Sequence, residues 1–363
     1  MTGSSAAVVD LDDGEALLAA DRDGLLRAAA MAGAQVRATA AALDEGLLES
    51  LRSGQLPRTV IWVAGRGTAE TAGAVLAAAF GAVVAAPIVT VADAPPWIGA
   101  LDVIVVAGDD PADPALVAAA AIGVRRGARV VVVAPYEGPL RDATAGRAVA
   151  LAPRLWVPDD FGLSRYLAAG LAVLQVVAPG LRVDLGELAD ELDAEALRNS
   201  AARELVTNPA KALAERMSGR DVVLAGDNAT TLALARHGAA VLLRVAQETV
   251  AAVGLGDVLV ALRSGFGAAG SGHGGASLFH DEELDGPLPR RARTFVLTTE
   301  AERPTVTARV SGYDDLDLVN AEDVPDGPEP GGAAAGGRGM EQQLAKLAVR
   351  LEMTAVYLRL VRG

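Results

Sequence analysis

The chain has 363 residues, of which 51% are hydrophobic and only 3% aromatic, and its formal net charge is -14 at pH 7. This length allows two domains or one large α/β unit with a substantial core. The acidic balance argues against nonspecific binding of nucleic acid, and the absence of cysteine excludes disulfides, cysteine-ligated zinc and a cysteine nucleophile. No apolar run reaches the roughly 18 uninterrupted residues of a membrane span, and the acidic N-terminus lacks a signal-peptide pattern, so we expect a cytoplasmic protein without a membrane partner.

The first half of the chain alternates between helix and strand patterns. Apolar residues at helical spacing over 16–43 predict one or two N-terminal helices. Apolar runs predict buried parallel strands at 59–65, 82–91, 101–108 and 128–134, with a short fifth strand at 155–158. Helices are expected between them at 69–80, 115–126 and 166–177. This alternation predicts a doubly wound parallel sheet, whose ligands lie beyond the carboxyl ends of the strands.

The second half repeats the pattern from Asn208 onward. Helices are expected at 211–217 and 230–237 and strands at 221–225, 294–297 and 305–310, while 239–243 fits a strand or the start of the next helix. We therefore predict the α/β class with two doubly wound parallel-sheet domains in three αβα layers. The predicted order is N-terminal helices (1–50), a first domain (51–180), a linker helix with a second domain (181–322), a flexible linker (323–339) and a final helix (340–363).

A candidate anion site follows the first predicted strand. Gly65, Arg66, Gly67 and Thr68 form a tight turn that leads directly into a helix. The free backbone N–H groups of a helix N-terminus favour an anion, and the side chains of Arg66 and Thr68 add donors. Many α/β proteins use this turn for no ligand, so both interpretations stay open.

A second candidate lies in the glycine-rich stretch 264–286. Glycine is dense from Gly265 to Gly275, and His280 then stands beside Asp281 and Glu282. A histidine next to carboxylates titrates near neutrality and is held in one tautomer, which suits proton transfer. The alternative is a solvated glycine linker with an incidental histidine.

Three features together resemble one family. The segment Asn208–Ala214 (NPAKALA), the His280-Asp281-Glu282 triplet and the two α/β halves look like the bifunctional phosphoglucose/phosphomannose isomerases, which are built from paired sugar isomerase (SIS) domains. The resemblance implies that glucose 6-phosphate or mannose 6-phosphate is converted to fructose 6-phosphate through a cis-enediol, with no cofactor and no metal. It also implies a homodimer in which the histidine reaches the partner's cleft.

The resemblance assigns a role to each matching residue. Gly65–Thr68 resembles the family's GMGGS phosphate loop, and Arg165, in PDDFGLSR, resembles the active-site arginine that would stabilise the oxyanion. Glu248 resembles the glutamate of the NENAK motif, which implies the base that moves a proton between C1 and C2. His280 resembles the histidine of the HNE motif, which implies ring opening. The family's late catalytic lysine has no clear counterpart.

The chain departs from the family at Gly108-Asp109-Asp110-Pro111. The family has a Ser/Thr-rich SYSGNTEE loop here, whose hydroxyls hold the sugar phosphate. Carboxylates that face a dianion in a partly desolvated cleft cost several kcal/mol. Either the aspartates point away from the ligand, or the site no longer binds phosphate as its relatives do. A further interpretation is that Asp110 caps the helix that starts near Pro114.

Each assignment has a structural alternative. Glu248 fits an exposed helix residue, His280 fits a cap in a surface loop, Arg165 fits an ion pair with Asp159 or Asp160, and Lys211 fits a role in starting its helix. The alternative function is a noncatalytic SIS-domain protein that binds a sugar phosphate or a partner enzyme as a regulator.

Overall fold

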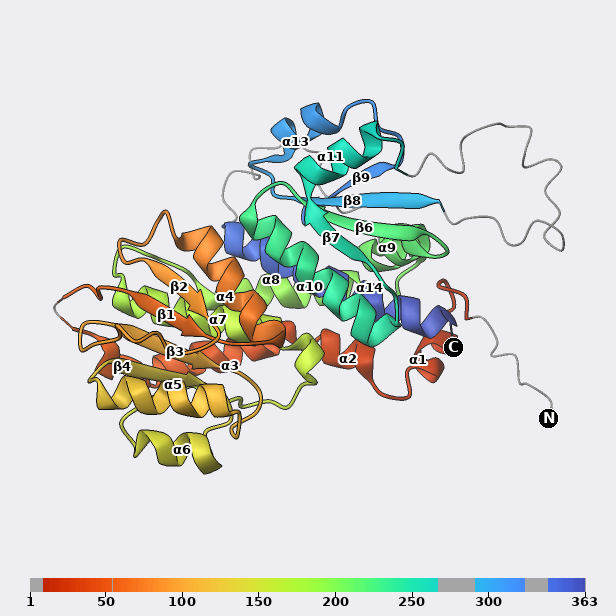
Figure 1. Ribbon diagram of the computed structural model, residues 1–363. Coiled ribbons are helices and arrows are strands. Elements are labelled where there is room, and N and C mark those ends of the chain that lie inside the picture. The colour runs from red at the N-terminus through yellow and green to blue at the C-terminus, as the bar shows by residue number, and fades with distance from the viewer. Residues whose placement is uncertain (1–8, 54, 267–290, 324–338, 363) are drawn as a thin grey trace, which may run out of the picture. The chain divides into compact units, whose positions relative to one another are not determined.

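The protein folds into two compact units, each built on one parallel sheet (Figure 1). Of the described residues, the N-terminal unit contains 23–53, 55–197 and 339–349, and the C-terminal unit contains 9–22, 198–266, 291–323 and 350–362. The predicted α/β class with two doubly wound parallel sheets is therefore confirmed. The computed structural model describes residues 9–53, 55–266, 291–323 and 339–362.

The sheet of the N-terminal unit has five parallel strands. Their spatial order is β2 (Ile88–Val91), β1 (Val60–Val63), β3 (Val103–Ala107), β4 (Arg129–Val133) and β5 (Val149–Ala150). The chain moves outward in one direction from β1 to β2 and in the other from β3 to β5, so the order reverses between β1 and β3. The helices of this unit are α2 (Leu25–Ala29), α3 (Ala32–Asp44), η1 (Glu49–Leu51), α4 (Gly67–Phe80), α5 (Pro114–Arg125), α6 (Gly138–Thr144), η2 (Asp159–Phe161), α7 (Leu163–Val177) and α8 (Leu185–Arg198).

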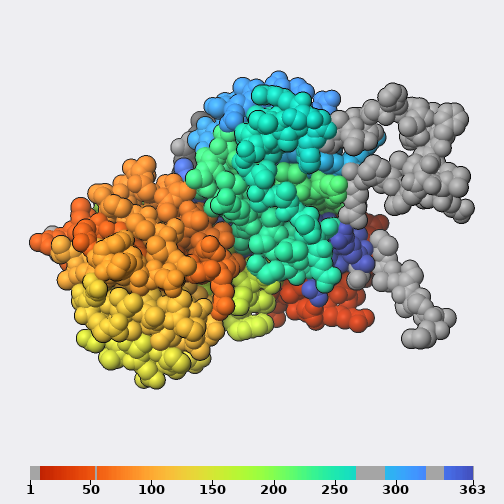
Figure 2. Space-filling view, in the orientation of Figure 1, coloured from red at the N-terminus to blue at the C-terminus, as the bar shows by residue number. Residues whose placement is uncertain are grey.

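Alternate residues of each strand pack against helices on opposite faces of this sheet, as the period of two requires. Ile61 and Val63 belong to a buried cluster with side chains of α5 and α6. The indole of Trp62 points to the other face, where it donates a hydrogen bond of 2.9 Å to the carbonyl of Ala69 in α4. Helices α5 and α6 lie side by side and form a continuous outer surface (Figure 2). The sheet is thus covered on both faces, which leaves its strand ends for ligands.

The sheet of the C-terminal unit has four parallel strands. Their order is β7 (Ala251–Gly254), β6 (Asp221–Gly226), β8 (Ala292–Thr298) and β9 (Leu316–Asn320), which reverses between β6 and β8. The other elements are α1 (Gly14–Ala20), η3 (Leu205–Thr207), α9 (Pro209–Met217), α10 (Ala229–Ala246), α11 (Leu255–Arg263), α13 (Arg303–Val310) and α14 (Met340–Arg362). Helix α14 is shared by the two units. Its residues up to Val349 belong to the N-terminal unit, and its residues from Arg350 belong to the C-terminal unit.

Both faces of this second sheet are also covered. Val223 and Val296 point toward α11 and α13, where they meet Leu255 and Val306. On the opposite face, the absence of a side chain at Gly238 lets α10 approach the sheet closely. A methyl group at this position would lie 2.8 Å from Leu224 Cδ1. None of the helices within the described ranges is long and apolar enough to cross a bilayer.

Several element predictions were wrong. The segment predicted as a strand at 305–310 is part of helix α13, which begins at Arg303 and has Pro304 in its first turn. The helix places Val306 and Val310, one turn apart, in the core. The fifth strand is Val149–Ala150 rather than 155–158, where Trp156 is 85% exposed. Segment 239–243 continues α10, and strands β7 and β9 were missed.

Candidate functional site

The carboxyl ends of β1 and β3 meet where the strand order of the N-terminal sheet reverses. Open parallel sheets bind their ligands at this point. Gly65–Thr68 follows β1 and leads into the 14-residue helix α4, and Gly108–Asp113 follows β3. Gly67 has a φ of +67°, a left-handed conformation that glycine adopts without strain. No side chain caps α4, so its first N–H groups are free to bind an anion.

The two side-chain donors of Gly65–Thr68 already have partners in the protein. The guanidinium of Arg66 lies 3.2 Å from the carboxylate of Asp113 and 3.7 Å from that of Asp110. The Thr68 hydroxyl is buried and donates to the backbone carbonyl of Asp159 at 3.2 Å. The backbone amides at the start of α4 are therefore the donors that this turn offers to a ligand.

Arg165, at the start of α7, reaches the same edge and forms an ion pair with Asp109. Its Nη2 also donates to the Tyr166 hydroxyl at 2.6 Å, and that hydroxyl donates to Asp109 Oδ1 at 2.6 Å. The side chain of Arg165 is 13% exposed. Burial raises the pKa of Tyr166 above its usual value, so the phenol stays protonated and remains a donor. Arg165 is thus an ion-pair partner of Asp109, an aspartate that the sequence analysis did not assign to it.

The aspartates after β3 have three different roles. Asp109 faces Arg165, whereas Asp110 is half exposed and accepts a hydrogen bond from the Ala112 N–H at 2.8 Å. Asp113 caps α5, because its Oδ1 accepts from the Ala115 N–H at 2.9 Å. The interpretation of Asp110 as the cap was therefore wrong by three positions. Asp109 thus points to the cation Arg165, whereas Asp110 lies at the surface.

A cavity of about 260 Å³ adjoins Arg165 between α3, α7 and the segment after β5. Its wall is mostly apolar, and its polar residues are Gln35, Thr39, Arg154 and Arg165. Gln35 donates to the Phe161 carbonyl at 3.0 Å. The apolar lining residues include Ala38, Ala42, Ala150, Leu151 and Ala169. A cavity of this size beside a guanidinium has room for the body of a small ligand.

Glu248 belongs to the C-terminal unit and is held by the last helix. Helix α10 ends at Ala246 and is followed by its capping residue Gln247, which has a φ of +57°. Glu248 comes next, before the amino end of β7. Its carboxylate forms an ion pair with Arg362 of α14, and its side chain is only 17% exposed. The alternative of an exposed helix residue was therefore wrong. His280 lies outside the described residues, as does His273 of the same glycine-rich stretch.

The motif at Asn208–Lys211 has a structural role. The Asn208 side chain caps α9 by accepting from the Lys211 N–H at 3.0 Å. Lys211 is fully buried, and its Nζ donates to the carbonyls of Ala201 at 2.9 Å and Arg203 at 2.7 Å. This ammonium ties the loop before η3 to α9, as the structural alternative expected.

Lys211→Met is expected to lower the free energy of unfolding by about 1–3 kcal/mol at pH 7, because two buried carbonyls lose their donor. Burial lowers the pKa of Lys211, against a smaller opposing effect of Asp12 and Asp10. The unfolded chain therefore binds this proton more tightly, and the wild type gains stability as pH rises from the lowered pKa to the ordinary lysine value. Urea unfolding at several pH values measures this gain. Parallel pH curves for wild type and variant would show that Lys211 does not supply it.

Comparisons with known proteins give the fold its context. No protein-family model and no curated protein matches the sequence. Among solved structures, tagatose-6-phosphate ketose/aldose isomerase from Escherichia coli matches with a TM-score of 0.58 and 14% identity, over 100% of this chain and 95% of that one. The C-terminal domain of glucosamine-fructose-6-phosphate aminotransferase from Francisella tularensis matches with a TM-score of 0.59 and 11% identity, over 94% and 98%.

A glucose-6-phosphate isomerase like protein from Thermus thermophilus matches with a TM-score of 0.53 and 19% identity, over 98% of this chain and 96% of that one. The chain therefore shares the two-domain α/β fold of these three proteins. The likeness extends over both units, and at these identities it establishes the fold alone. The narrower resemblance to bifunctional phosphoglucose/phosphomannose isomerases stays a prediction.

Proposed function

We propose that the protein is a sugar isomerase that binds a hexose phosphate at the carboxyl edge of its five-stranded sheet. The observation that carries this proposal is the uncapped start of α4 at the point where the strand order reverses. The names of three structural neighbours support the ligand class, since they refer to tagatose 6-phosphate, glucose 6-phosphate and fructose 6-phosphate.

The proposed reaction interconverts an aldose and a ketose, glucose 6-phosphate or mannose 6-phosphate with fructose 6-phosphate, through a cis-enediol. It moves one proton between C1 and C2 and needs no external oxidant. We assign the proton transfer to Glu248, ring opening to His280 of a partner subunit in a homodimer, and stabilisation of the oxyanion to Arg165. The phosphate binds the backbone amides at Gly67 and Thr68.

A second candidate function is a noncatalytic regulator that binds a sugar phosphate or a partner enzyme. It is favoured by the ion pairs of both charged candidates, since Arg165 is paired with Asp109 and Glu248 with Arg362. A catalytic group with a permanent partner must exchange that partner before it acts on a substrate.

A coupled assay and thermal denaturation distinguish the two functions. The isomerase should convert glucose 6-phosphate or mannose 6-phosphate to fructose 6-phosphate, and both sugar phosphates should raise its Tm. A rise in Tm without turnover would support the regulator. If neither ligand reacts or raises the Tm at millimolar concentration, both functions are wrong.

A further inference from the structure

We propose that Asp109 is the specificity determinant of this site, because its carboxylate occupies two donors, Arg165 and the Tyr166 hydroxyl, that would otherwise add to the α4 amides in binding a ligand phosphate. The inference rests on the proposed function, since it concerns the same edge of the five-stranded sheet. Asp109 selectively weakens the binding of ligands that carry a phosphate dianion and has little effect on the binding of neutral sugars.

The geometry around Asp109 supports this role. Two donors converge on its Oδ1, the guanidinium of Arg165 and the hydroxyl of Tyr166 at 2.6 Å. Arg165 is placed by Tyr166, whose ring centroid lies 4.3 Å from the guanidinium carbon. Guanidinium and phenol donors bind phosphate oxygens as readily as carboxylate oxygens. Asp109 therefore competes directly with a phosphate for the same atoms.

The charges at this edge of the sheet support the same role for Asp109. Two arginines, Arg66 and Arg165, face three aspartates, Asp109, Asp110 and Asp113, so this group carries a net charge of -1 before any ligand binds. An arriving dianion gains Arg165 only if it displaces Asp109, and the displaced carboxylate then repels it at short range. A neutral sugar meets no such repulsion.

Asp109→Asn tests the inference, because it keeps the shape of the side chain and removes its charge. Isothermal titration calorimetry measures the affinity of wild type and variant for inorganic phosphate, glucose 6-phosphate and glucose. We expect phosphate and glucose 6-phosphate to bind at least tenfold more tightly to the variant, and the affinity for glucose to change less than twofold. Asp109→Ala should give the same selectivity and serves if the asparagine variant folds poorly.

Two controls make the test specific. Asp44→Asn removes one charge from the exposed end of α3, where the structure gives the carboxylate no partner among the described residues, and should leave all three affinities unchanged. In an Arg165→Met background, the gain from Asp109→Asn should fall below threefold, because Asp109 acts through the arginine.

The outcomes separate this inference from the proposed function. If wild type binds glucose 6-phosphate but Asp109→Asn and Asp109→Ala bind it no more tightly, the inference is wrong and the proposed function stands. If inorganic phosphate binds more tightly to the Asp109 variants while no protein binds glucose 6-phosphate, the inference stands and the proposed function is wrong. An equal gain for glucose would also overturn the inference, because it would show a general loosening of the site.

Discussion

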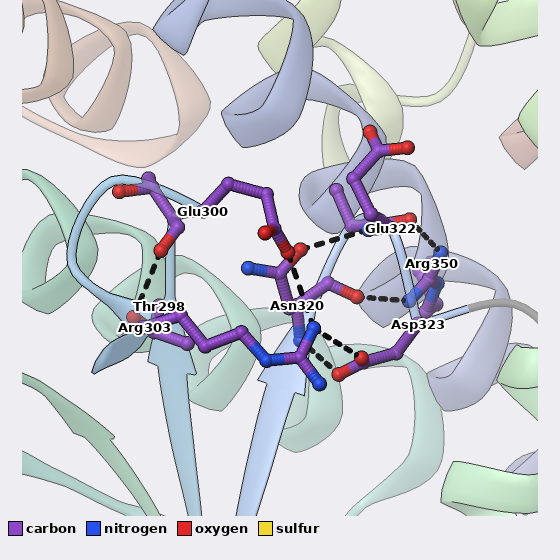
Figure 3. A network of polar contacts seen from close by, with 9 residues as sticks. Thr298, Glu300, Arg303, Asn320, Glu322, Asp323 and Arg350 are labelled. Atoms are coloured by element: carbon purple, nitrogen blue, oxygen red, sulfur yellow. Dashed lines mark hydrogen bonds and ion pairs between the residues drawn. The ribbon is translucent and has the colours of Figure 1, made fainter. Parts of the chain in front are cut away.

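Arg350→Met is expected to lower the free energy of unfolding by about 3–5 kcal/mol, because it leaves two buried carbonyls without donors. Arg350 is 1% exposed, and its guanidinium donates to the carbonyl of Asn320 at 2.7 Å and to that of Ala321 at 2.8 Å (Figure 3). These contacts join α14 to the carboxyl end of β9. Methionine fills a similar volume but donates nothing.

The segment that Arg350 contacts belongs to a connected network of polar side chains (Figure 3). Asp323 accepts from the Asn320 N–H at 3.1 Å, and Arg303 lies 2.8 Å from Asp323 and 3.1 Å from Glu300. The network links the ends of β8 and β9 to the start of α13. Loss of Arg350 should therefore weaken the packing of this edge as well as the two hydrogen bonds.

Arg359→Met is the matched control for this prediction. Arg359 is on the same helix but exposed, so its substitution should change the free energy of unfolding by less than about 1 kcal/mol. Urea denaturation followed by circular dichroism measures both variants. Equal losses for the two substitutions would show that the buried carbonyl contacts are not the source of the stability.

Glu248→Gln is expected to lower kcat for sugar-phosphate isomerisation by about 10²–10⁴-fold, the contribution of a positioned general base. Glutamine keeps the size of the side chain and cannot accept the proton from C2 of the substrate. KM should change little, because the assigned role lies in proton transfer rather than in phosphate binding. A coupled assay with glucose 6-phosphate measures both constants.

Arg362→Met separates catalysis by Glu248 from its structural contact. It breaks the same ion pair, since Arg362 is the partner of Glu248 in α14, but leaves the carboxylate in place. We expect both variants to lose similar stability and only Glu248→Gln to lose most of its turnover. Equal losses of turnover in the two variants would assign Glu248 a structural role instead.

The central strands could be predicted from the sequence because both of their faces are buried. Strands β1 and β3, and β4 after its first residue Arg129, are continuous apolar runs, as parallel strands covered by helices require. The outer strands β7 and β9 of the second sheet gave no such signal, since they expose part of their residues. The prediction at α13 was wrong because its threonine and valine content favours a strand. The segment is a helix in which Val306 and Val310 pack in the core.

The candidate site could be predicted only in part. The strand, turn and helix around Gly65–Thr68 indicated the position of the amides, and the structure has this arrangement. The pair of Arg165 with Asp109 was missed because its members are 56 positions apart and nearer aspartates competed for the assignment. A usable signal existed, since Asp109 follows a predicted central strand and such ends meet at one edge of a sheet.

The central claim is that the amides at the start of α4 bind the phosphate of a sugar, and Gly67→Val tests it directly. A valine at a φ of +67° strains the backbone and displaces these amides, although no atom beyond its chain neighbours and the backbone of its own helix lies within 4 Å of its Cβ position. Gly219→Val is the matched control, because Gly219 has a φ of +66° and equally open space in the C-terminal unit. Calorimetric titration with glucose 6-phosphate should show at least tenfold weaker binding to Gly67→Val and unchanged binding to Gly219→Val, whereas equal affinities for wild type and both variants would contradict the claim.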